Sequence, residues 1–381
     1  LPLSLSVFLA GVIRGYQNMR YLTGTAIIGD FLKMAIAISL VLLGYKLFGF
    51  LIGYVVAAII VFVLRVNSIK LFIAKFKIPN IRLVVRYALP SFITQSFWLL
   101  LLNGQYLIIS AVQNTYATGL FAVGMILSNQ IYFIPRIISD ALFPITSKLS
   151  SNKNFIQQQR NLLNLALRYS LLVSIPILVF VTLFPKPLIF LIGRPHFFPA
   201  AQIVPVLITA SLFFGIATLL SRTLYAIGKP ITFQNISIVC IIFYLITSFT
   251  LTYLFSALGT AIAFLLTAIL LAIVSLYYLR KYISFKIDFS TISKILISCA
   301  LAFVSLYAIS PFVPNLIIGG ILTSIFTVLY FMVLYFLKFY NENDIKILDF
   351  ASEKVPFVSM ILKIIKRILL KKIYSKTKYY K

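Results

Sequence analysis

The sequence predicts an all-α protein, a polytopic bundle of transmembrane helices. The chain is 61% hydrophobic and only 11% charged, whereas soluble domains carry about 25% charged residues. Its mean hydropathy is +1.05. Apolar runs of about 20 residues, the length that crosses a hydrocarbon core, recur along the whole chain. These observations exclude an ordinary soluble domain.

Ten segments are long enough to span a membrane. They lie near residues 22–44, 48–66, 87–111, 117–136, 162–185, 200–227, 232–255, 257–279, 293–312 and 316–338. The first 13 residues are apolar but too short to cross, and no basic stretch precedes them as in a signal peptide. Because no initiator Met is present, we expect the chain to begin partway through a helix. The prediction is about ten complete transmembrane helices plus one partial helix.

The loops alternate between basic and uncharged. Residues 65–86 hold six Lys or Arg and no acid, whereas residues 112–119 hold no charge. Since cytosolic loops carry the excess of Lys and Arg, the alternation predicts a multi-pass protein of the cytoplasmic membrane with a cytosolic C-terminus. It also explains the net charge of +27 without a nucleic-acid partner.

The C-terminal residues 355–381 combine two patterns. Ile, Leu and Val recur at helical spacing, with basic residues such as Lys363, Lys366 and Arg367 between them. This predicts an amphipathic helix lying on anionic lipids. The alternative is a solvated basic tail.

Few residues offer catalytic or metal chemistry. The single histidine, His196, lies in an outward turn where we expect solvent exposure, and Cys240 and Cys299 lie inside apolar segments. The loops predicted to face outward are short and carry no acid. We therefore expect no enzyme activity, no metal and no cofactor.

Polar residues within spans are the candidate binding residues, because a charge in the bilayer centre is costly. Asp30 and Lys33 lie one helical turn apart and form either a structural ion pair or a charge facing a cavity. Asn103, Gln105 and Asn129 are expected to make interhelical hydrogen bonds or to contact a sugar.

Arg136 and Asp140 form an (i, i+4) pair. One interpretation is that they mark the point where a helix leaves the membrane, with Pro144 kinking or ending that helix. The other is that Arg136 lies at the cytosolic mouth of a cavity and meets a phosphate there. Arg222, one turn before a cytosolic loop, admits the same two interpretations, because an arginine fork matches phosphate oxygens.

Several short stretches resemble one known family. They are GVIRGYQNMRY (11–21), RYALPSFI (86–93), DALFPITSKL (140–149), LIGRPHFFPAAQIVPVLI (191–208), YAIGKP (225–230) and ALGTAIAFLLT (257–267). In order and spacing they are similar to polysaccharide biosynthesis proteins that flip lipid-linked oligosaccharides, within the multidrug/oligosaccharidyl-lipid/polysaccharide exporter superfamily. The similarity runs from about residue 5 to 280.

The resemblance implies a two-bundle flippase architecture with the first bundle truncated. Its expected parts are half of the first bundle (1–76), a complete second bundle (77–282), two appended helices (283–340) and a cytosolic basic tail (341–381).

The same resemblance implies that the protein flips a polyprenyl-phosphate-linked oligosaccharide by alternating access, with anionic lipids and glycosyltransferases of the same pathway as partners. Such transport breaks no bond. A drug or small-solute antiporter is the alternative, followed by a membrane enzyme of glycan assembly.

Overall fold

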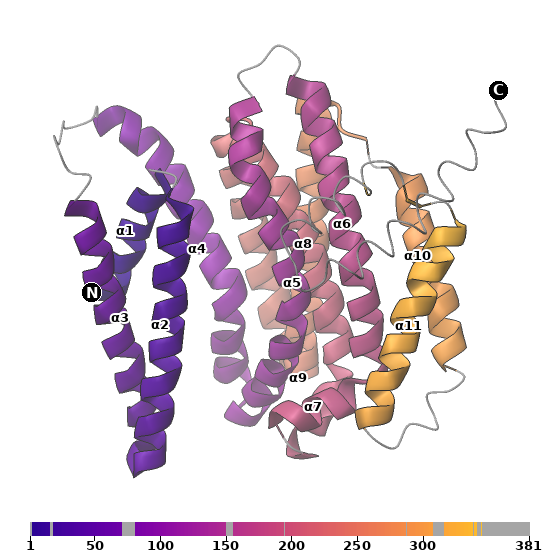
Figure 1. Cartoon of the computed structure of the whole chain (residues 1–381), viewed down its shortest axis with the longest axis horizontal. Helices are drawn as coiled ribbons and strands as arrows, with labels where there is room; N and C mark the ends of the chain where they lie inside the picture. The colour runs from indigo at the N-terminus through magenta and orange to yellow at the C-terminus, as the bar shows by residue number, and fades with distance from the viewer. Residues whose placement is uncertain are drawn as a thin grey trace. The chain divides into compact units, whose positions relative to one another are not determined.

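The computed structural model confirms the predicted all-α class, because every regular element among the described residues is helical (Figure 1). The structure describes residues 2–15, 18–70, 81–149, 155–193, 195–286, 288–307, 316–337, 339, 340 and 344. Within these, six helical stretches are long and apolar enough to cross a membrane. The chain is therefore a multi-pass membrane protein.

The helices follow one another in the predicted order, and two short elements, α7 and the 3-10 helix η2, occupy the predicted outward turn. The bounds are α1 Pro2–Gly15, α2 Met19–Leu40, η1 Val41–Tyr45, α3 Lys46–Lys70, α4 Ile81–Val112, α5 Thr115–Leu149, α6 Phe155–Leu183, α7 Pro185–Gly193, η2 Pro195–Gln202, α8 Val204–Ala226, α9 Pro230–Ile283, α10 Phe289–Tyr307 and α11 Leu316–Phe336.

The chain forms two compact units, Leu1–Val84 and Val85–Lys381. In the first unit, α2 and α3 form a tight hairpin that reverses at Gly44, whose φ is 93°. A Cβ added at Gly53 would lie 2.7 Å from the backbone nitrogen of Ala37. The two helices therefore touch backbone to backbone, as small residues in transmembrane helices allow.

A buried arginine ties together the three helices α1, α2 and α3 of the first unit. Arg65 donates hydrogen bonds to the backbone and hydroxyl oxygens of Ser6, at 2.9 and 2.8 Å, and to the Thr25 hydroxyl at 3.4 Å. Sequence reasoning assigned Arg65 to a cytosolic loop. The structure places Arg65 within α3 and not in a loop, and hydroxyl and carbonyl oxygens of two other helices satisfy its guanidinium.

The second unit is built around α8, which packs against α5, α6 and α9. Fifteen residues of α8 are buried, so this helix lies in the core of the unit. The segment α9 is a second hairpin, because Ser256 has φ 54° and ψ −138°. The hydroxyls of Thr252 and Thr260 consequently lie 2.7 Å apart, although in a straight helix these residues would be about 12 Å apart along the axis. The reversal predicted around Ser256 is thus confirmed.

The helix α5 extends beyond the predicted span 117–136, and the interpretation that it leaves the membrane near Arg136 stays a prediction. This helix continues through Pro135 and Pro144 to Leu149. Each proline removes one backbone donor, and the remaining hydrogen bonds carry the helix onward. Arg136 and Asp140 therefore lie inside a long helix and not at its end.

The domain boundaries predicted at residues 76, 282 and 340 stay predictions, and the predicted surface helix in residues 355–381 lies outside the described residues.

Candidate functional site

The helices α5 and α8 run side by side in the same direction, and their seam carries the candidate site. Glycine permits this close approach, because a Cβ added at Gly215 of α8 would lie 2.8 Å from Cγ of Pro135 in α5. The rings of Tyr132 and Phe214 pack at 5.1 Å on one side of this contact. The rings of Phe143 and Tyr225 lie 5.9 Å apart further along.

Between these two aromatic contacts lies a charge cluster made of Arg136, Asp140 and Arg222. One carboxylate oxygen of Asp140 forms an ion pair with Arg222 of α8, and the other lies 3.9 Å from Nε of Arg136. The three side chains are 44%, 55% and 31% exposed, respectively. The guanidinium of Arg136 also lies 5.7 Å from the centroid of the Tyr132 ring. Three of the predicted site residues are thus brought together.

The same end of the second unit is rich in basic residues. Arg160 at the start of α6 donates to the backbone oxygen of Ile283 at 2.5 Å. Lys229, between α8 and α9, lies 5.1 Å from the centroid of the Tyr282 ring. The start of α6, the end of α8 and the end of α9 therefore meet at this end of the unit. Their basic side chains make the end that carries the charge cluster positively charged.

The three predicted amide residues, Asn103, Gln105 and Asn129, lie away from the charge cluster. Asn103 is exposed and donates to Leu99 O at 3.3 Å, whereas Gln105 is fully buried and donates to Leu101 O at 2.5 Å. Both bonds stay within α4. Asn129 is exposed on α5, 11 residues before Asp140, which is about 16 Å along the axis. Their assignment to sugar binding stays a prediction.

Asp30 and Lys33 form the ion pair that their spacing predicts. The Nζ atom of Lys33 lies 2.8 Å from Asp30, and the two side chains are 34% and 74% exposed, respectively. Lys33 also lies 5.5 Å from the centroid of the Tyr54 ring in α3. Both residues lie in the first unit, whereas the charge cluster belongs to the second.

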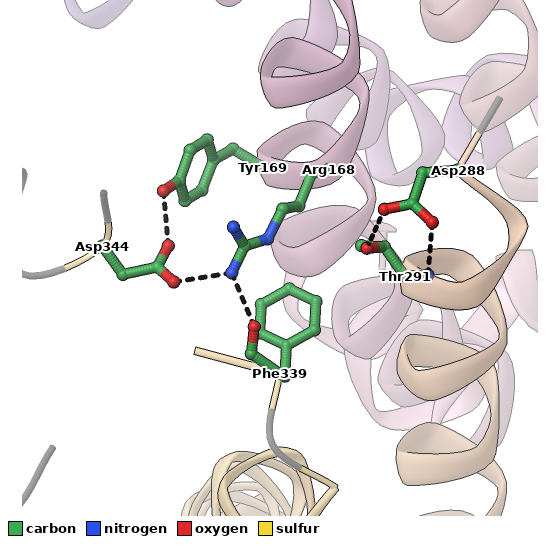
Figure 2. Close-up of polar contacts among 6 residues, drawn as sticks. All are labelled: Arg168, Tyr169, Asp288, Thr291, Phe339 and Asp344. Carbon is green, nitrogen blue, oxygen red and sulfur yellow. Dashed lines mark hydrogen bonds and ion pairs between the residues drawn. The ribbon is translucent and has the colours of Figure 1, made fainter. Parts of the chain in front are cut away.

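Sequence reasoning missed a second arginine–aspartate pair, which we call the α6 latch (Figure 2). Arg168 of α6 pairs with Asp344 at 2.6 Å and donates to Phe339 O at 2.9 Å. The hydroxyl of Tyr169 donates to Asp344 at 2.5 Å. Arg168 and Asp344 are only 8% and 7% exposed. The available signal was an arginine inside the predicted span 162–185, which requires an acidic partner.

Around this latch, the appended helices pack on α6. The hydroxyl of Tyr330 in α11 donates to Leu172 O at 3.0 Å. Asp288 caps α10, accepting from the backbone nitrogen of Thr291 at 3.2 Å and from its hydroxyl at 2.5 Å. The hydroxyl bond lowers the pKa of Asp288. The Tyr330 bond attaches α11 to α6, and the latch attaches Phe339 and Asp344 to the same helix.

The chemistry open to the charge cluster is anion binding. Two guanidinium groups from two helices present forks of donors that match phosphate oxygens. Within the described part of the chain, no group of three His, Cys, Asp or Glu side chains could hold a metal ion. His196 is exposed at the turn, as expected, and its ring lies 5.5 Å from the Tyr116 ring.

The fold defines a polytopic helical membrane protein with a basic end to its second unit. Residues 5–194 match the family described as polysaccharide biosynthesis protein. The chain is similar to this family over those residues, which is the family that the sequence motifs resemble.

A curated relative and two solved structures are similar to the chain. A probable low-salt glycan biosynthesis flippase of Haloferax volcanii is 22% identical over 157 residues, which cover 41% of this chain and 33% of that protein. The chain thus matches about a third of the length of this relative.

Among solved structures, the lipid II flippase MurJ in an inward closed conformation matches with a TM-score of 0.71 at 17% identity, covering 87% of this chain and 72% of that one. A point mutant of a MATE protein matches with a TM-score of 0.59 at 14% identity, covering 74% and 66%. These two likenesses concern the fold.

Proposed function

We propose that the protein flips a polyprenyl-phosphate-linked oligosaccharide across the cytoplasmic membrane by alternating access, for the assembly of cell-surface glycan. The observation that carries the proposal is the charge cluster at the seam of α5 and α8. Arg136 and Arg222 offer two cationic forks, partly exposed, at the basic end of a bundle. A lipid-linked saccharide needs a cationic polar surface for its phosphate-bearing head while its polyprenyl chain stays in lipid.

The family and the curated relative support the same substrate class. The family is described by polysaccharide biosynthesis, and the relative is named a glycan biosynthesis flippase. Movement of such a molecule requires no bond cleavage, so we propose a transporter and not an enzyme. We place the basic end in the cytosol because basic loops are retained there. The carrier would therefore meet Arg136 and Arg222 on the side where its sugars are assembled, next to the glycosyltransferases of the pathway.

The likeness to a MATE protein keeps a drug or small-solute antiporter as the alternative. Such a protein depends on a membrane carboxylate that binds the coupling ion. In the described spans Asp30 is paired with Lys33, and Asp140 with two arginines. A carboxylate held by cations is a poor site for a further cation, so the structure favours the flippase.

The test uses cells that lack the intact gene. Lipid-linked saccharides are quantified by mass spectrometry, and their membrane face is determined with a glycosidase or lectin that cannot cross the membrane. We expect completed carriers to accumulate on the cytosolic face and surface glycan to decrease. The intact gene should reverse both effects, whereas R136Q and R222Q should not.

The matched control is R280Q, which removes an exposed arginine from the last turn of α9 at the same basic end. It should restore transport. If the carrier pool stays unchanged while the tolerance to toxic solutes changes, the antiporter is correct and the flippase proposal fails.

A further inference from the structure

Asp140 has an unusual position in the charge distribution of the second unit. Residues 85–287 contain thirteen Lys and Arg but a single acid, and that acid is Asp140. It lies between the two arginines that we propose to meet phosphate. Its two carboxylate oxygens face different partners, with Arg222 on one and Arg136 on the other.

The two contacts resemble those of a bound anion, with a hydrogen-bonded ion pair to Arg222 and a looser ion pair to Arg136 at 3.9 Å. A carboxylate places two oxygens against guanidinium donors, as a phosphate group does. Here the anion belongs to the protein, because Asp140 comes from α5, one turn beyond Arg136. The carboxylate is 55% exposed, and an ion pair with this exposure is weak and screened by solvent. A mobile anion of higher charge can therefore replace it.

We propose that Asp140 is an internal counter-ion, displaced from Arg136 and Arg222 when the phosphate group of the substrate arrives, and returning when the substrate leaves. The inference rests on the proposed function and assigns Asp140 a positioning role in it. In the unloaded protein Asp140 holds the two arginines in place on their helices. In the loaded protein the phosphate oxygens take the guanidinium donors.

This exchange makes binding depend on the charge of the ligand. A carboxylate carries one negative charge, and so does a single phosphate esterified to both a lipid and a sugar. A diphosphate that links the two carries one charge on each phosphate, because esterification removes only the second ionisation of a terminal phosphate. An incoming carboxylate therefore gains nothing over Asp140, while a doubly charged phosphoryl head group gains Coulomb attraction to both arginines. The substrate class is thus a lipid with a multiply charged phosphoryl head.

Removing the carboxylate of Asp140 should therefore raise the affinity for the phosphate group and lower the transport rate. Without the carboxylate, the phosphate meets no internal competitor at the two arginines and binds more tightly. Release then lacks the competitor that reclaims the arginines, so turnover slows. A residue that only stabilises the fold would lower both quantities together.

The experiment uses the purified full chain, with farnesyl diphosphate as the probe and affinity measured by titration calorimetry. We expect D140N to bind the probe about tenfold more tightly than the wild type, which corresponds to about 1.4 kcal/mol. R222Q should bind at least tenfold more weakly. The control is D288N, which removes the same charge from the same unit outside the charge cluster and keeps a side chain that caps helices well. Its affinity should equal that of the wild type.

If D140N does not fold, a comparison of two probes on the wild type tests the same inference. Farnesoic acid carries the same isoprenoid chain on a single carboxylate, and it should bind at least tenfold more weakly than farnesyl diphosphate. Equal affinities of these two probes would overturn the inference, as would a D140N affinity within twofold of the wild type or below it.

The failure of the counter-ion is distinguishable from the failure of the proposed function. If the wild type binds farnesyl diphosphate and requires Arg222, but D140N is unchanged, only the role of Asp140 is wrong. If neither the wild type nor D140N binds the probe, and the carrier pool in cells is unaffected, both proposals are wrong.

Discussion

The α6 latch leads to a quantitative prediction about stability. Asp344 and Arg168 are 7% and 8% exposed, so replacing Asp344 by alanine leaves a guanidinium buried without its counter-ion. Removing one partner of a buried ion pair costs about 3–5 kcal/mol of unfolding free energy. The Nε atom of Arg168 already lacks a hydrogen-bond partner among the described residues. The destabilisation caused by D344A should therefore lie within this range, because few other contacts compensate for the lost carboxylate. Y169F, which removes one hydrogen bond to Asp344, should cost about 1 kcal/mol.

The assay is equilibrium unfolding in mixed micelles of SDS and a mild detergent. A double variant, R168M with D344L, removes both charges and replaces them with apolar volume, and such replacements are often neutral. It should therefore recover most of the loss of D344A. D288N, an exposed capping residue, is the control and should change stability by less than about 0.5 kcal/mol. A loss below about 1 kcal/mol in D344A, or a double variant as unstable as the single one, would refute the reasoning.

Three further predictions concern the same structure. G53A should destabilise the first unit by about 1–3 kcal/mol, because the added Cβ meets the Ala37 backbone. G24A has open space around it and should stabilise the unit by about 0.5–1 kcal/mol. Unfolding in mixed micelles measures both changes. The Thr291 hydroxyl lowers the pKa of Asp288. The Asp288 carboxylate should therefore make its full contribution to stability above about pH 4. This contribution should disappear as the pH falls through the lowered pKa. An acid titration of unfolding should show this loss in the wild type but not in D288A. G215A should separate α5 from α8 at Pro135 and reduce transport. A flipping assay in proteoliposomes should show the reduced rate, and size-exclusion chromatography should show that the variant is folded.

The sequence predicted the features that depend on local pattern. Apolar length and alternating basic loops predicted the helices, and the uncharged turn around Ser256 marked a hairpin that the structure contains. The (i, i+4) spacing predicted the contact of Arg136 with Asp140. The span 117–136 is shorter than α5, which continues through Pro135 and Pro144 to Leu149.

The features that depend on packing could not be predicted in the same way. Arg222 reaches Asp140 across 82 residues of sequence, and this contact follows from the close approach of α5 and α8 at Gly215. Arg168 and Asp344 are 176 residues apart. The sequence contains both residues of each pair, but the partner of an arginine is determined by which helices touch.

The two arginine–aspartate pairs of the second unit have the same chemistry and opposite consequences, and burial separates them. The α6 latch is almost fully buried, so its charges have no alternative partner in water, and breaking the pair costs several kcal/mol, about 3–5. The charge cluster is 31–55% exposed, so water and ions compete for its charges, and such a pair contributes only about 0–1 kcal/mol. A pair of the first kind holds helices together. A pair of the second kind can be opened and closed by a ligand, as the proposed binding and release of a phosphate group requires.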